Sequence, residues 1–227
     1  MCGRFTLRTP PRQLAEQFAC ELPKDFPVRF NIAPTQPVAA IRAGAGGQCE
    51  FTFLRWGLIP AWADDPRIGA RMINARAETV AEKRAFRAAF QHRRCLILAD
   101  GYYEWKKTPH GKQPYFIRLP QDQPFALAGL WETWRDPQNN ETVGSCTILT
   151  TEAPEEMRAI HPRVPVVLLD DAPARWMTMD PQDKLERQQV LQAVNPRWLC
   201  LDPVDPWVNN PQNEGPRCIS PLASGDA

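Results

Sequence analysis

The chain has 227 residues, of which 43% are hydrophobic and 23% charged, and its formal net charge is +1. These fractions are typical of a globular protein, and the length favours one domain with a sizeable core. The sequence has no apolar run of 18 residues and no signal-peptide layout at its start, which argues against a membrane span and against secretion. We therefore expect a cytoplasmic protein that makes no contact with membranes.

The first half of the chain predicts two helices and two strands. Thr9, followed by two prolines and then by apolar residues at helical spacing, predicts a capped helix of about ten residues. Strands are expected over residues 38–41 and 51–56, where β-branched and aromatic residues lie between turn signals. The capping box Thr79-Val80-Ala81-Glu82 predicts a second helix, with phenylalanines on one face and basic residues on the other.

The second half predicts more short elements, separated by prolines. Strands are expected over residues 95–99, 114–119, 125–130, 146–150 and 164–169, and helices over 154–160, 172–177 and 181–194. Because strands and helices do not alternate regularly, we predict an α+β fold: a single domain with a curved, barrel-like, mixed or antiparallel β-sheet flanked by several short helices. The domain is expected over residues 1–219, with a disordered tail over 220–227.

The seven cysteines lie at positions 2, 20, 49, 95, 146, 200 and 218, an odd number without a Cys-x-x-Cys pair. This spacing argues against a disulfide framework and against a zinc site. We expect most of the cysteines to be small buried side chains. No metal or cofactor is expected.

Positive charge is concentrated between residues 67 and 94, where eight Lys or Arg residues meet only two acids, Glu78 and Glu82. Such an excess is typical of a surface that binds phosphates. A solvated helix face would have the same composition, and charge alone does not separate the two interpretations. The eight tryptophans add candidate stacking surfaces, although most tryptophans lie in protein cores.

Cys2 directly follows Met1, so removal of one residue leaves a cysteine with a free α-amine beside its thiol. An aldehyde condenses with such an amine to an imine, and the thiol then closes onto the same carbon to give a thiazolidine ring. The α-amine titrates near about 7.7–8.0 and a cysteine near about 8.5, so both groups suit neutral pH. By position alone, a reactive cysteine and a buried structural one are equally supported.

Three later segments carry chemical side chains. Asn74-Ala75-Arg76 places an amide and a guanidinium just before the predicted capping box. Gly101-Tyr102-Tyr103-Glu104-Trp105 places one carboxylate among aromatic residues, where an apolar setting would raise its pKa for proton transfer. His161 lies between a predicted helix and a predicted strand, where a structural role is the commoner one.

Two further segments complete a recognisable set: Asn31-Ile32-Ala33-Pro34-Thr35 and Trp56-Gly57-Leu58-Ile59-Pro60-Ala61-Trp62. In their order along the chain, the N-terminal Cys2 and these five segments resemble the SOS-response-associated peptidase family, the abasic-site processing proteins. The resemblance covers nearly the whole chain, from Cys2 to the region 209–219. It implies that Cys2 reacts with the ring-opened aldehyde of an abasic site in single-stranded DNA, and that the thiazolidine crosslink shields the lesion.

The resemblance also implies a role for each matching residue. Cys2 would be the nucleophile, Asn74 would orient the Cys2 backbone and the sugar, Glu104 would shuttle protons, and His161 would protonate the sugar oxygen and assist reversal. DNA binding would fall to Arg4, Arg76 and Arg163 at phosphates, to Trp62, Trp105 and Pro34 at bases, and to Thr150. The chain departs from the family's pattern at Pro162 and Val164, and Pro162 biases His161 toward an extended conformation.

The partner implied by the resemblance is single-stranded DNA that contains abasic sites, including strand-to-duplex junctions, bound by a monomer. The protein would associate with the nucleoid when it is bound to damaged DNA. The family name implies a peptidase step, the removal of Met1 by the protein itself, and the reaction has a lyase-like character. A general aminopeptidase would also remove Met1, because cysteine is small.

Two other functions remain open at this stage. Met-Cys-Gly also begins N-terminal-nucleophile amidotransferases, in which the thiol attacks an amide, but the Tyr-Glu-Trp segment has no explanation there. A non-covalent single-strand binder would need only the basic stretch and the tryptophans. Salt separates this non-covalent binder from a crosslinking protein, since non-covalent binding falls steeply with salt and an existing crosslink does not.

Overall fold

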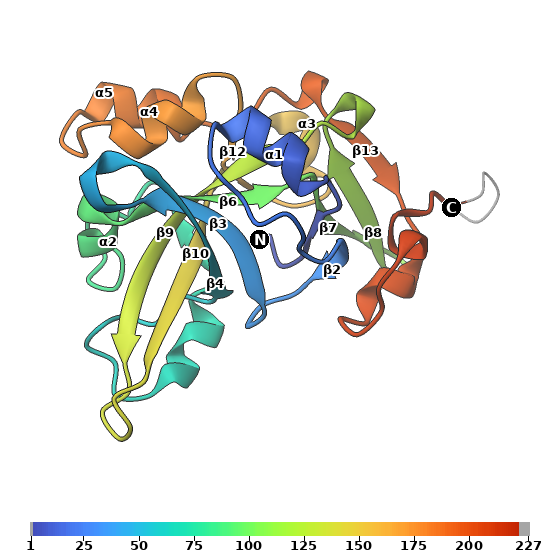
Figure 1. Ribbon diagram of the computed structural model, residues 1–227. Coiled ribbons are helices and arrows are strands. Elements are labelled where there is room, and N and C mark those ends of the chain that lie inside the picture. Colours follow the sequence, from blue (N-terminus) through green and yellow to red (C-terminus); the bar gives the residue numbers. More distant parts are fainter. Residues whose placement is uncertain (1, 223–227) are drawn as a thin grey trace.

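A computed structural model describes residues 2–222 of the chain. Its larger sheet closes on itself, because β10 pairs with β4 on one side and with β9 on the other. The strands β10, β4, β3, β6 and β9 thereby form a barrel, seen at the centre and left of Figure 1. Their bounds are Pro37–Ala43 for β3, Cys49–Trp56 for β4, Arg94–Ala99 for β6, Phe125–Arg135 for β9 and Thr142–Glu152 for β10.

The barrel is mixed, since β10 and β4 are parallel and the other neighbouring pairs are antiparallel. Three short strands extend it. β5 (Asn74–Arg76) lies parallel to β10, β11 (Arg163–Pro165) lies antiparallel to β10, and β12 (Val167–Leu168) pairs with β9. β5 and β11 matter for the site, because they bring two of the predicted site segments to the same strand.

A second sheet lies against the barrel, with the strand order β13-β8-β7-β1-β2. β1 is one of its inner strands and lies between β7 and β2. Asp100 alone separates β6 of the barrel from β7 of this sheet. The bounds are Phe5–Leu7 for β1, Arg29–Ile32 for β2, Gly101–Thr108 for β7, Gly111–Arg118 for β8 and Cys200–Pro203 for β13.

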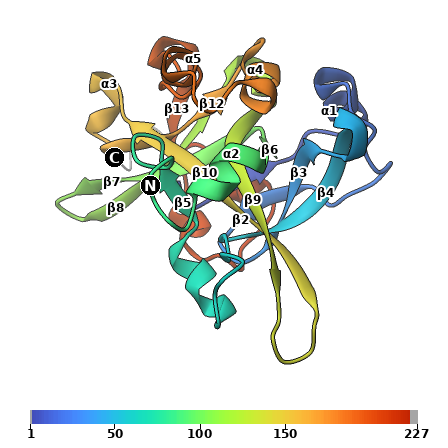
Figure 2. The same cartoon turned by 90° about the vertical axis from the view of Figure 1, so that its left-hand side faces the viewer.

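The helices are short and lie around the barrel (Figures 1 and 2). α4 is anchored by the buried Trp176, whose indole N–H donates to the carbonyl oxygen of Cys95 on β6 at 3.0 Å. None of the helices within residues 2–222 has the length and apolarity needed to cross a membrane. The α-helices are α1 (Pro11–Phe18), α2 (Arg87–His92), α3 (Glu155–Arg158), α4 (Ala172–Thr178) and α5 (Lys184–Val190).

Gly57 explains part of the Trp-Gly-Leu-Ile-Pro motif that follows β4. Its φ is +124°, and an added Cβ would lie 2.5 Å from the carbonyl oxygen of Gly69. No other residue type fits a backbone of this conformation at this distance. The preceding Trp56 is fully buried, and its indole N–H donates to the carbonyl oxygen of Ile73 at 2.9 Å, next to β5.

The predicted fold class is confirmed. Each strand expected from an apolar run is present, and the run expected over 164–169 is divided into β11 and β12. The helices expected near 154–160, 172–177 and 181–194 are present as the shorter α3, α4 and α5. Five strands were not predicted (β1, β2, β5, β7 and β13), because they are short or lack apolar alternation and are held by pairing with distant segments.

The helix expected after Thr9 is confirmed as α1, but neither Thr9 nor Thr79 caps a helix. The Thr79 capping box opens a series of turns, and α2 begins only at Arg87. In these turns Val80 becomes fully buried, so tertiary packing outweighs the local capping signal. α1 begins at Pro11, and the hydroxyl of Thr9 donates to Asp100 at 3.0 Å instead of capping the helix.

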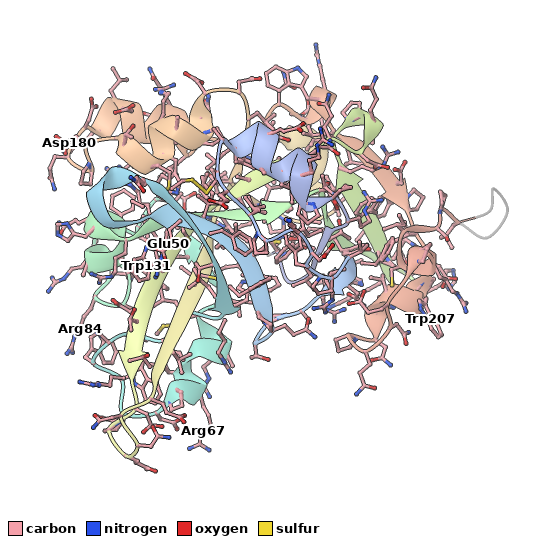
Figure 3. All side chains as sticks on the ribbon, in the orientation of Figure 1. Glu50, Arg67, Arg84, Trp131, Asp180 and Trp207 are labelled. Atoms are coloured by element: carbon pink, nitrogen blue, oxygen red, sulfur yellow. A yellow bond between two sulfur atoms is a disulfide. The ribbon has the colours of Figure 1, made fainter. Side chains whose placement is uncertain are left out.

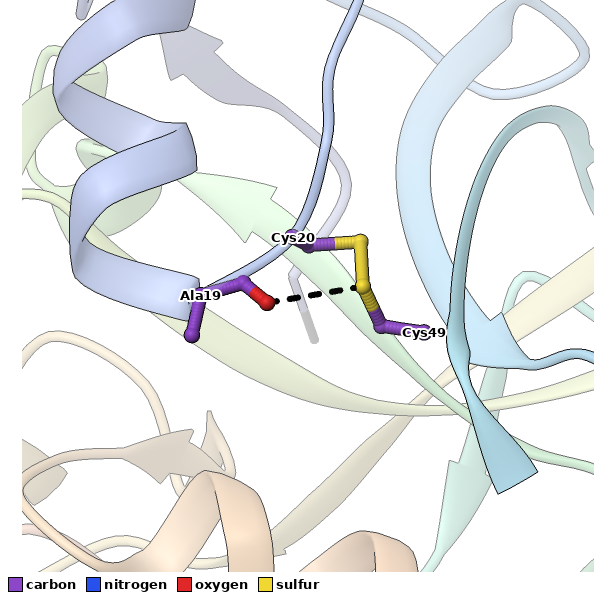
Figure 4. The surroundings of a disulfide bond; sticks show 3 residues. All are labelled: Ala19, Cys20 and Cys49. Carbon is purple, nitrogen blue, oxygen red and sulfur yellow. Dashed lines mark hydrogen bonds between the residues drawn. A yellow bond between two sulfur atoms is a disulfide. The ribbon is translucent and has the colours of Figure 1, made fainter.

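The expectation of no disulfide needs a correction, because Cys20 and Cys49 form one, with their Cα atoms 5.7 Å apart. Ala19 ends α1 in a left-handed conformation with φ 48°, which turns the next residue toward the start of β4 (Figure 4). The Cys49 sulfur lies 3.6 Å from the Ala19 carbonyl oxygen. Tertiary proximity creates this pair, and the sequence spacing gives no sign of it. Among the other cysteines Cys2, Cys95, Cys146 and Cys218 are buried.

The expected tail falls mostly outside the described residues. Within them, the Ser220 carbonyl oxygen accepts from the Asp205 N–H at 3.2 Å, and the Leu222 N–H donates to Pro203 at 3.0 Å. Residues 223–227 are not described.

Candidate active site

Cys2 lies three residues before the start of β1 and is fully buried. Its sulfur lies 3.9 Å from the carbonyl oxygen of Arg4. Burial raises the pKa of the Cys2 thiol far above its ordinary value, and the negative charge of Glu104 raises it further. The thiol is therefore protonated at neutral pH, and it needs a base beside it before it can act as a nucleophile.

Asn74 fixes the Cys2 backbone from the side of the barrel. β5 pairs with β10 so that Asn74 lies opposite Ile148, and the Asn74 amide donates to the Cys2 carbonyl oxygen at 2.8 Å. The amide oxygen of Asn74 is buried and has no hydrogen-bond partner among the described residues. A buried acceptor of this kind is usually satisfied, so it indicates a place for a ligand hydroxyl or amine.

Glu104 approaches from the second sheet. On β7 it lies opposite Tyr115 of β8, two residues beyond Tyr102, which pairs with Phe5 of β1. Only 3% of the Glu104 surface is exposed, and this burial raises the pKa of the carboxyl group, with the charge of His161 opposing the rise. Because burial raises its pKa, this carboxyl group is a stronger base than a free one, and beside a buried thiol it is suited to accepting and returning a proton.

His161 completes the group, with its Nδ1 atom 4.0 Å from a carboxylate oxygen of Glu104. The same nitrogen lies 3.1 Å from the backbone nitrogen of Arg163 and 3.0 Å from its carbonyl oxygen, so its hydrogen-bonding role follows the tautomer. The neighbouring Pro162 lacks an N–H, but its carbonyl oxygen accepts from Ala153 at 3.0 Å and holds the turn. His161 remains partly exposed, with 29% of its side chain accessible.

These four side chains come from four separate elements and meet at the junction of the barrel and the second sheet. Within the described residues, no cluster of three His, Cys, Asp or Glu side chains is arranged to hold a metal ion. A cleft of about 1140 Å³ lies between α1, α4 and the start of β4, but none of these four residues lines it. The geometry therefore locates the candidate chemistry at Cys2 and not in this cleft.

Arg163 and Thr150, two of the predicted DNA-binding residues, are hydrogen-bonded to each other. The Arg163 guanidinium pairs with Glu78 at 2.8 Å and donates to the hydroxyl of Thr150 at 3.3 Å. Arg76 ends β5 opposite Thr150, and its side chain is exposed. Arg76 is therefore the more available of the two guanidinium groups for a phosphate.

Arg4 and Trp105 are tied to the C-terminal segment. The Arg4 guanidinium donates to Asn31 at 2.8 Å and to the carbonyl oxygen of Val208 at 2.9 Å, and it lies 5.9 Å from the Trp105 ring. The Trp105 indole N–H donates to the Asn209 side chain at 2.7 Å. These bonds fix the orientation of both side chains beside β7.

Trp62 is 48% exposed and lies under Arg84, whose guanidinium carbon is 4.6 Å from the ring centre. Pro34 is half-buried in the turn before β3.

The structure divides the basic stretch 67–94 into two groups. Three of its arginines bind protein groups, namely Arg67 with Asp65, Arg93 with Glu132 and Arg94 with the carbonyl oxygen of Met179. Five others, Arg71, Arg76, Lys83, Arg84 and Arg87, are exposed, and Figure 3 shows Arg84 and Arg67 on the side of the molecule opposite Trp207.

Two buried polar residues support the site, and the sequence alone assigned a role to neither. Asp100 accepts hydrogen bonds from the hydroxyl of Thr6 and from the backbone and side chain of Thr9, which fixes the middle of β1 and the segment that follows it. Asn31 donates to three carbonyl oxygens, those of Val208, Asn210 and Asn213. A carboxylate directly after five buried apolar residues was the available signal for Asp100.

Known proteins are similar to this chain in sequence and in fold. A family model described as SOS response associated peptidase (SRAP) matches residues 1–211. The abasic site processing protein YoqW of Bacillus subtilis is 41% identical over 223 residues, which cover 96% of this chain and 99% of YoqW. The abasic site processing protein YedK of Escherichia coli is 30% identical over 229 residues, which cover 98% of this chain and all of YedK.

A crystal structure of a protein from Bacteroides thetaiotaomicron has the same fold, with a TM-score of 0.83 at 20% identity, over 98% of this chain and 100% of that one. The structural likeness concerns the fold alone. The family-model match and the identities to YoqW and YedK concern the sequence, and they extend over the segments that carry Cys2, Asn74, Glu104 and His161. The chain therefore belongs to the SOS response associated peptidase family.

Proposed function

We propose that this protein processes abasic sites in single-stranded DNA by forming a covalent thiazolidine crosslink through Cys2. The relatives YoqW and YedK are named abasic site processing proteins, which supports the lesion as the target. One observation carries the chemistry: Cys2 is held by Asn74 at 2.8 Å, and Glu104, whose carboxyl pKa is raised by burial, lies within electrostatic range of its thiol.

The proposed reaction balances with the loss of one water. The Cys2 amine adds to C1 of the ring-opened sugar, and the C1 oxygen leaves as water, which gives an imine. The thiol then adds to the same carbon, its proton moves to the nitrogen, and the C–S bond closes the ring. Each step moves a proton at the Cys2 nitrogen, at its sulfur or at the C1 oxygen, and one buried carboxyl group serves all three sites.

The residues have separate tasks in this proposal. Glu104 takes the thiol proton and returns protons to the departing oxygen, because its raised pKa makes the carboxylate a stronger base. Asn74 orients Cys2 with its amide N–H, and its buried oxygen accepts a hydrogen bond from the sugar or the amine. His161, 4.0 Å from Glu104, protonates the ring oxygen during ring opening and assists reversal.

Removal of Met1 is part of the proposal, because an acylated nitrogen cannot form the imine. The protein itself or an aminopeptidase performs this peptidase step. An imine at C1 is also the species from which strand cleavage by elimination begins, which is the lyase-like branch of the reaction. Ring closure by the Cys2 sulfur removes that imine and thereby protects the strand.

The DNA partner is part of the same proposal. Arg76, Arg163 and Arg4 contact phosphates, Trp62, Trp105 and Pro34 contact bases, and Thr150 positions Arg163, to which it is bonded at 3.3 Å. The protein acts as a monomer in the cytoplasm, on the nucleoid, and accepts bare single strands and strand-to-duplex junctions.

The test is a denaturing gel of Met1-processed protein mixed with a single strand that carries one abasic site. The wild type is expected to give a heat-stable shifted band, and an undamaged strand none. Cys2→Ser keeps the amine and loses the sulfur, so its band should need borohydride reduction to survive heating. Cys200→Ser is the matched control, since Cys200 is a free, half-buried cysteine on β13.

A processed wild type without a heat-stable band would contradict the proposal. So would a Cys2→Ser variant that crosslinks as stably as the wild type. Glutamine hydrolysis in the absence of DNA would instead support the amidotransferase alternative.

A further inference from the structure

The hairpin formed by β7 and β8 extends beyond the candidate site and carries three lysines near its tip. Figure 2 shows the hairpin projecting from the rest of the molecule, on the side where β7 and β8 are labelled. The register beyond Glu104 pairs Trp105 with Pro114, Lys106 with Gln113 and Lys107 with Lys112. We call Lys106, Lys107 and Lys112 the basic arm.

Lys107 and Lys112 lie directly opposite each other in this register, and both are exposed. Like charges at opposite positions of an antiparallel pair destabilise a hairpin. Residues 105–113 contain no Asp or Glu. None of the ion pairs found within residues 2–222 includes a residue of the basic arm. An external polyanion would remove this repulsion.

One face of the hairpin runs from the neighbourhood of Cys2 and Glu104 to two lysines of the basic arm. Side chains alternate along a strand, so Trp105 and Lys107 share one face of β7, and Lys112 lies on the same face of β8. Arg4 lies over the Trp105 ring at 5.9 Å. This face therefore begins with Arg4 and Trp105 beside the site and ends with two lysines at the hairpin tip.

The same alternation places Glu104 and Lys106 on the other face of β7, so Lys106 lies on the face of Glu104, and Lys107 and Lys112 lie on the face of Trp105. Lys107 is three residues beyond Glu104, a distance of about 10 Å along β7. Each nucleotide of a stacked strand advances about 3.4 Å. DNA that leaves the lesion along the hairpin reaches Lys107 and Lys112 after about three nucleotides. A polyanion with regular charges at this spacing fits the basic arm better than a single small anion does.

We propose that the β7–β8 hairpin is a DNA-backbone clamp, in which the basic arm contacts phosphates about three nucleotides to one side of the abasic site. The inference rests on the proposed function for the position of the lesion. It adds a contact surface outside the residues that carry the family motifs, and it makes the protein sensitive to the length of one flank of the strand.

The test compares Lys107→Gln/Lys112→Gln with Lys24→Gln/Lys184→Gln, a matched control that removes two exposed lysines from other parts of the chain. Fluorescence anisotropy gives the affinity for an undamaged single strand over a series of salt concentrations. Two lost phosphate contacts should reduce the slope of log K against log salt by about 1.4, and the control should leave it unchanged. The hairpin variant should unfold at the same or a higher denaturant concentration than the wild type, because a like-charge pair is removed.

A second series locates the contact. Single strands with one abasic site are shortened on the 5′ side or on the 3′ side, and the crosslinking rate of each is measured at limiting protein concentration. The difference between wild type and hairpin variant should disappear when one flank is shorter than about three nucleotides, and persist when the other flank is shortened.

The two proposals fail in different ways. A normal crosslink with an unchanged salt slope, or with a slope that falls equally in the control, would overturn the clamp and leave the crosslink intact. A reduced slope in the hairpin variant of a protein that forms no crosslink would support the clamp and overturn the proposed function.

Discussion

Asp100 allows a specific stability prediction, because its hydrogen-bond partners should respond differently to replacement by alanine and by asparagine. Its carboxylate lies almost fully buried and accepts from the backbone N–H groups of Arg8 and Thr9, from the hydroxyls of Thr6 and Thr9, and from the Arg8 side chain. Asp100→Ala leaves both backbone N–H groups without an acceptor. Each such group costs about 1–3 kcal/mol, so we expect a loss of about 3–5 kcal/mol in the free energy of unfolding.

Asp100→Asn should cost less, because the amide can rotate. Its oxygen then keeps the Arg8 and Thr9 backbone donors, and its NH₂ group donates to the Thr6 hydroxyl, which itself can turn to Gly101 at 3.3 Å. Only the charged bond to the Arg8 side chain, which is 3.1 Å long in the wild type, is lost. A charge-assisted bond contributes about 1.5–3 kcal/mol, and we expect the lower end because Arg8 is partly exposed.

Urea unfolding of the two variants, followed by tryptophan fluorescence, measures both values. Asp122→Ala is the matched control, because Asp122 is a second carboxylate on Arg8, at 3.3 Å, with 52% of its side chain exposed. An exposed pair contributes about 0–1 kcal/mol. The reasoning would be refuted if Asp100→Ala cost no more than Asp122→Ala, or if the Asn variant were less stable than the Ala variant.

Three further predictions concern the site and the disulfide. Glu104→Gln should lower the crosslinking rate by about 100-fold or more, measured by quenched-gel kinetics, because it cannot transfer a proton. Burial raises the Glu104 pKa, so its contribution to stability is complete below its unfolded-state pKa and is lost as pH rises through the folded-state pKa; the Gln variant should lack this loss. His161→Ala should slow crosslinking and its reversal while leaving non-covalent DNA affinity within about twofold, and unchanged kinetics in both directions would remove His161 from the mechanism. Breaking the Cys20–Cys49 bond, which links residues 29 apart, should lower the free energy of unfolding by about 3.5 kcal/mol, compared by urea unfolding between Cys49→Ser and wild type with and without a dithiol reductant.

The barrel could be predicted from sequence because its strands are apolar runs. β6 reads Arg-Cys-Leu-Ile-Leu-Ala and is buried along five of its six positions, and such a run indicates a strand without further information. The closing parallel pair of β10 and β4 was not predictable, because residues as distant as Arg55 and Ser145 meet there. No local pattern specifies such a contact.

The second sheet shows why the rest was missed. β1 has three residues, and β7 reads Gly-Tyr-Tyr-Glu-Trp-Lys-Lys-Thr, without apolar alternation. Both are stabilised by each other and by Asp100, a buried group whose importance depends on the three-dimensional arrangement. The failed capping box at Thr79 has the same cause, since burial of Val80 takes precedence over a local signal.

The four candidate residues could be selected from the sequence without knowledge of the fold that brings them together. Cys2, Asn74, Glu104 and His161 stood out by residue type and motif, and they lie together at the junction of the two sheets. The basic stretch was a weaker guide, because residue counts do not show which arginines already have partners. Arg93, for example, pairs with Glu132 at 2.6 Å.

The most direct test of the central claim is the chemical identity of the crosslink. The purified adduct of Met1-processed protein is digested with nuclease and trypsin, treated with a thiol-alkylating reagent and analysed by mass spectrometry. The account predicts a sugar remnant on the peptide from Cys2 to Arg4, with loss of one water and a sulfur that does not alkylate. An adduct whose Cys2 sulfur still alkylates, or one carried by a lysine, would contradict it.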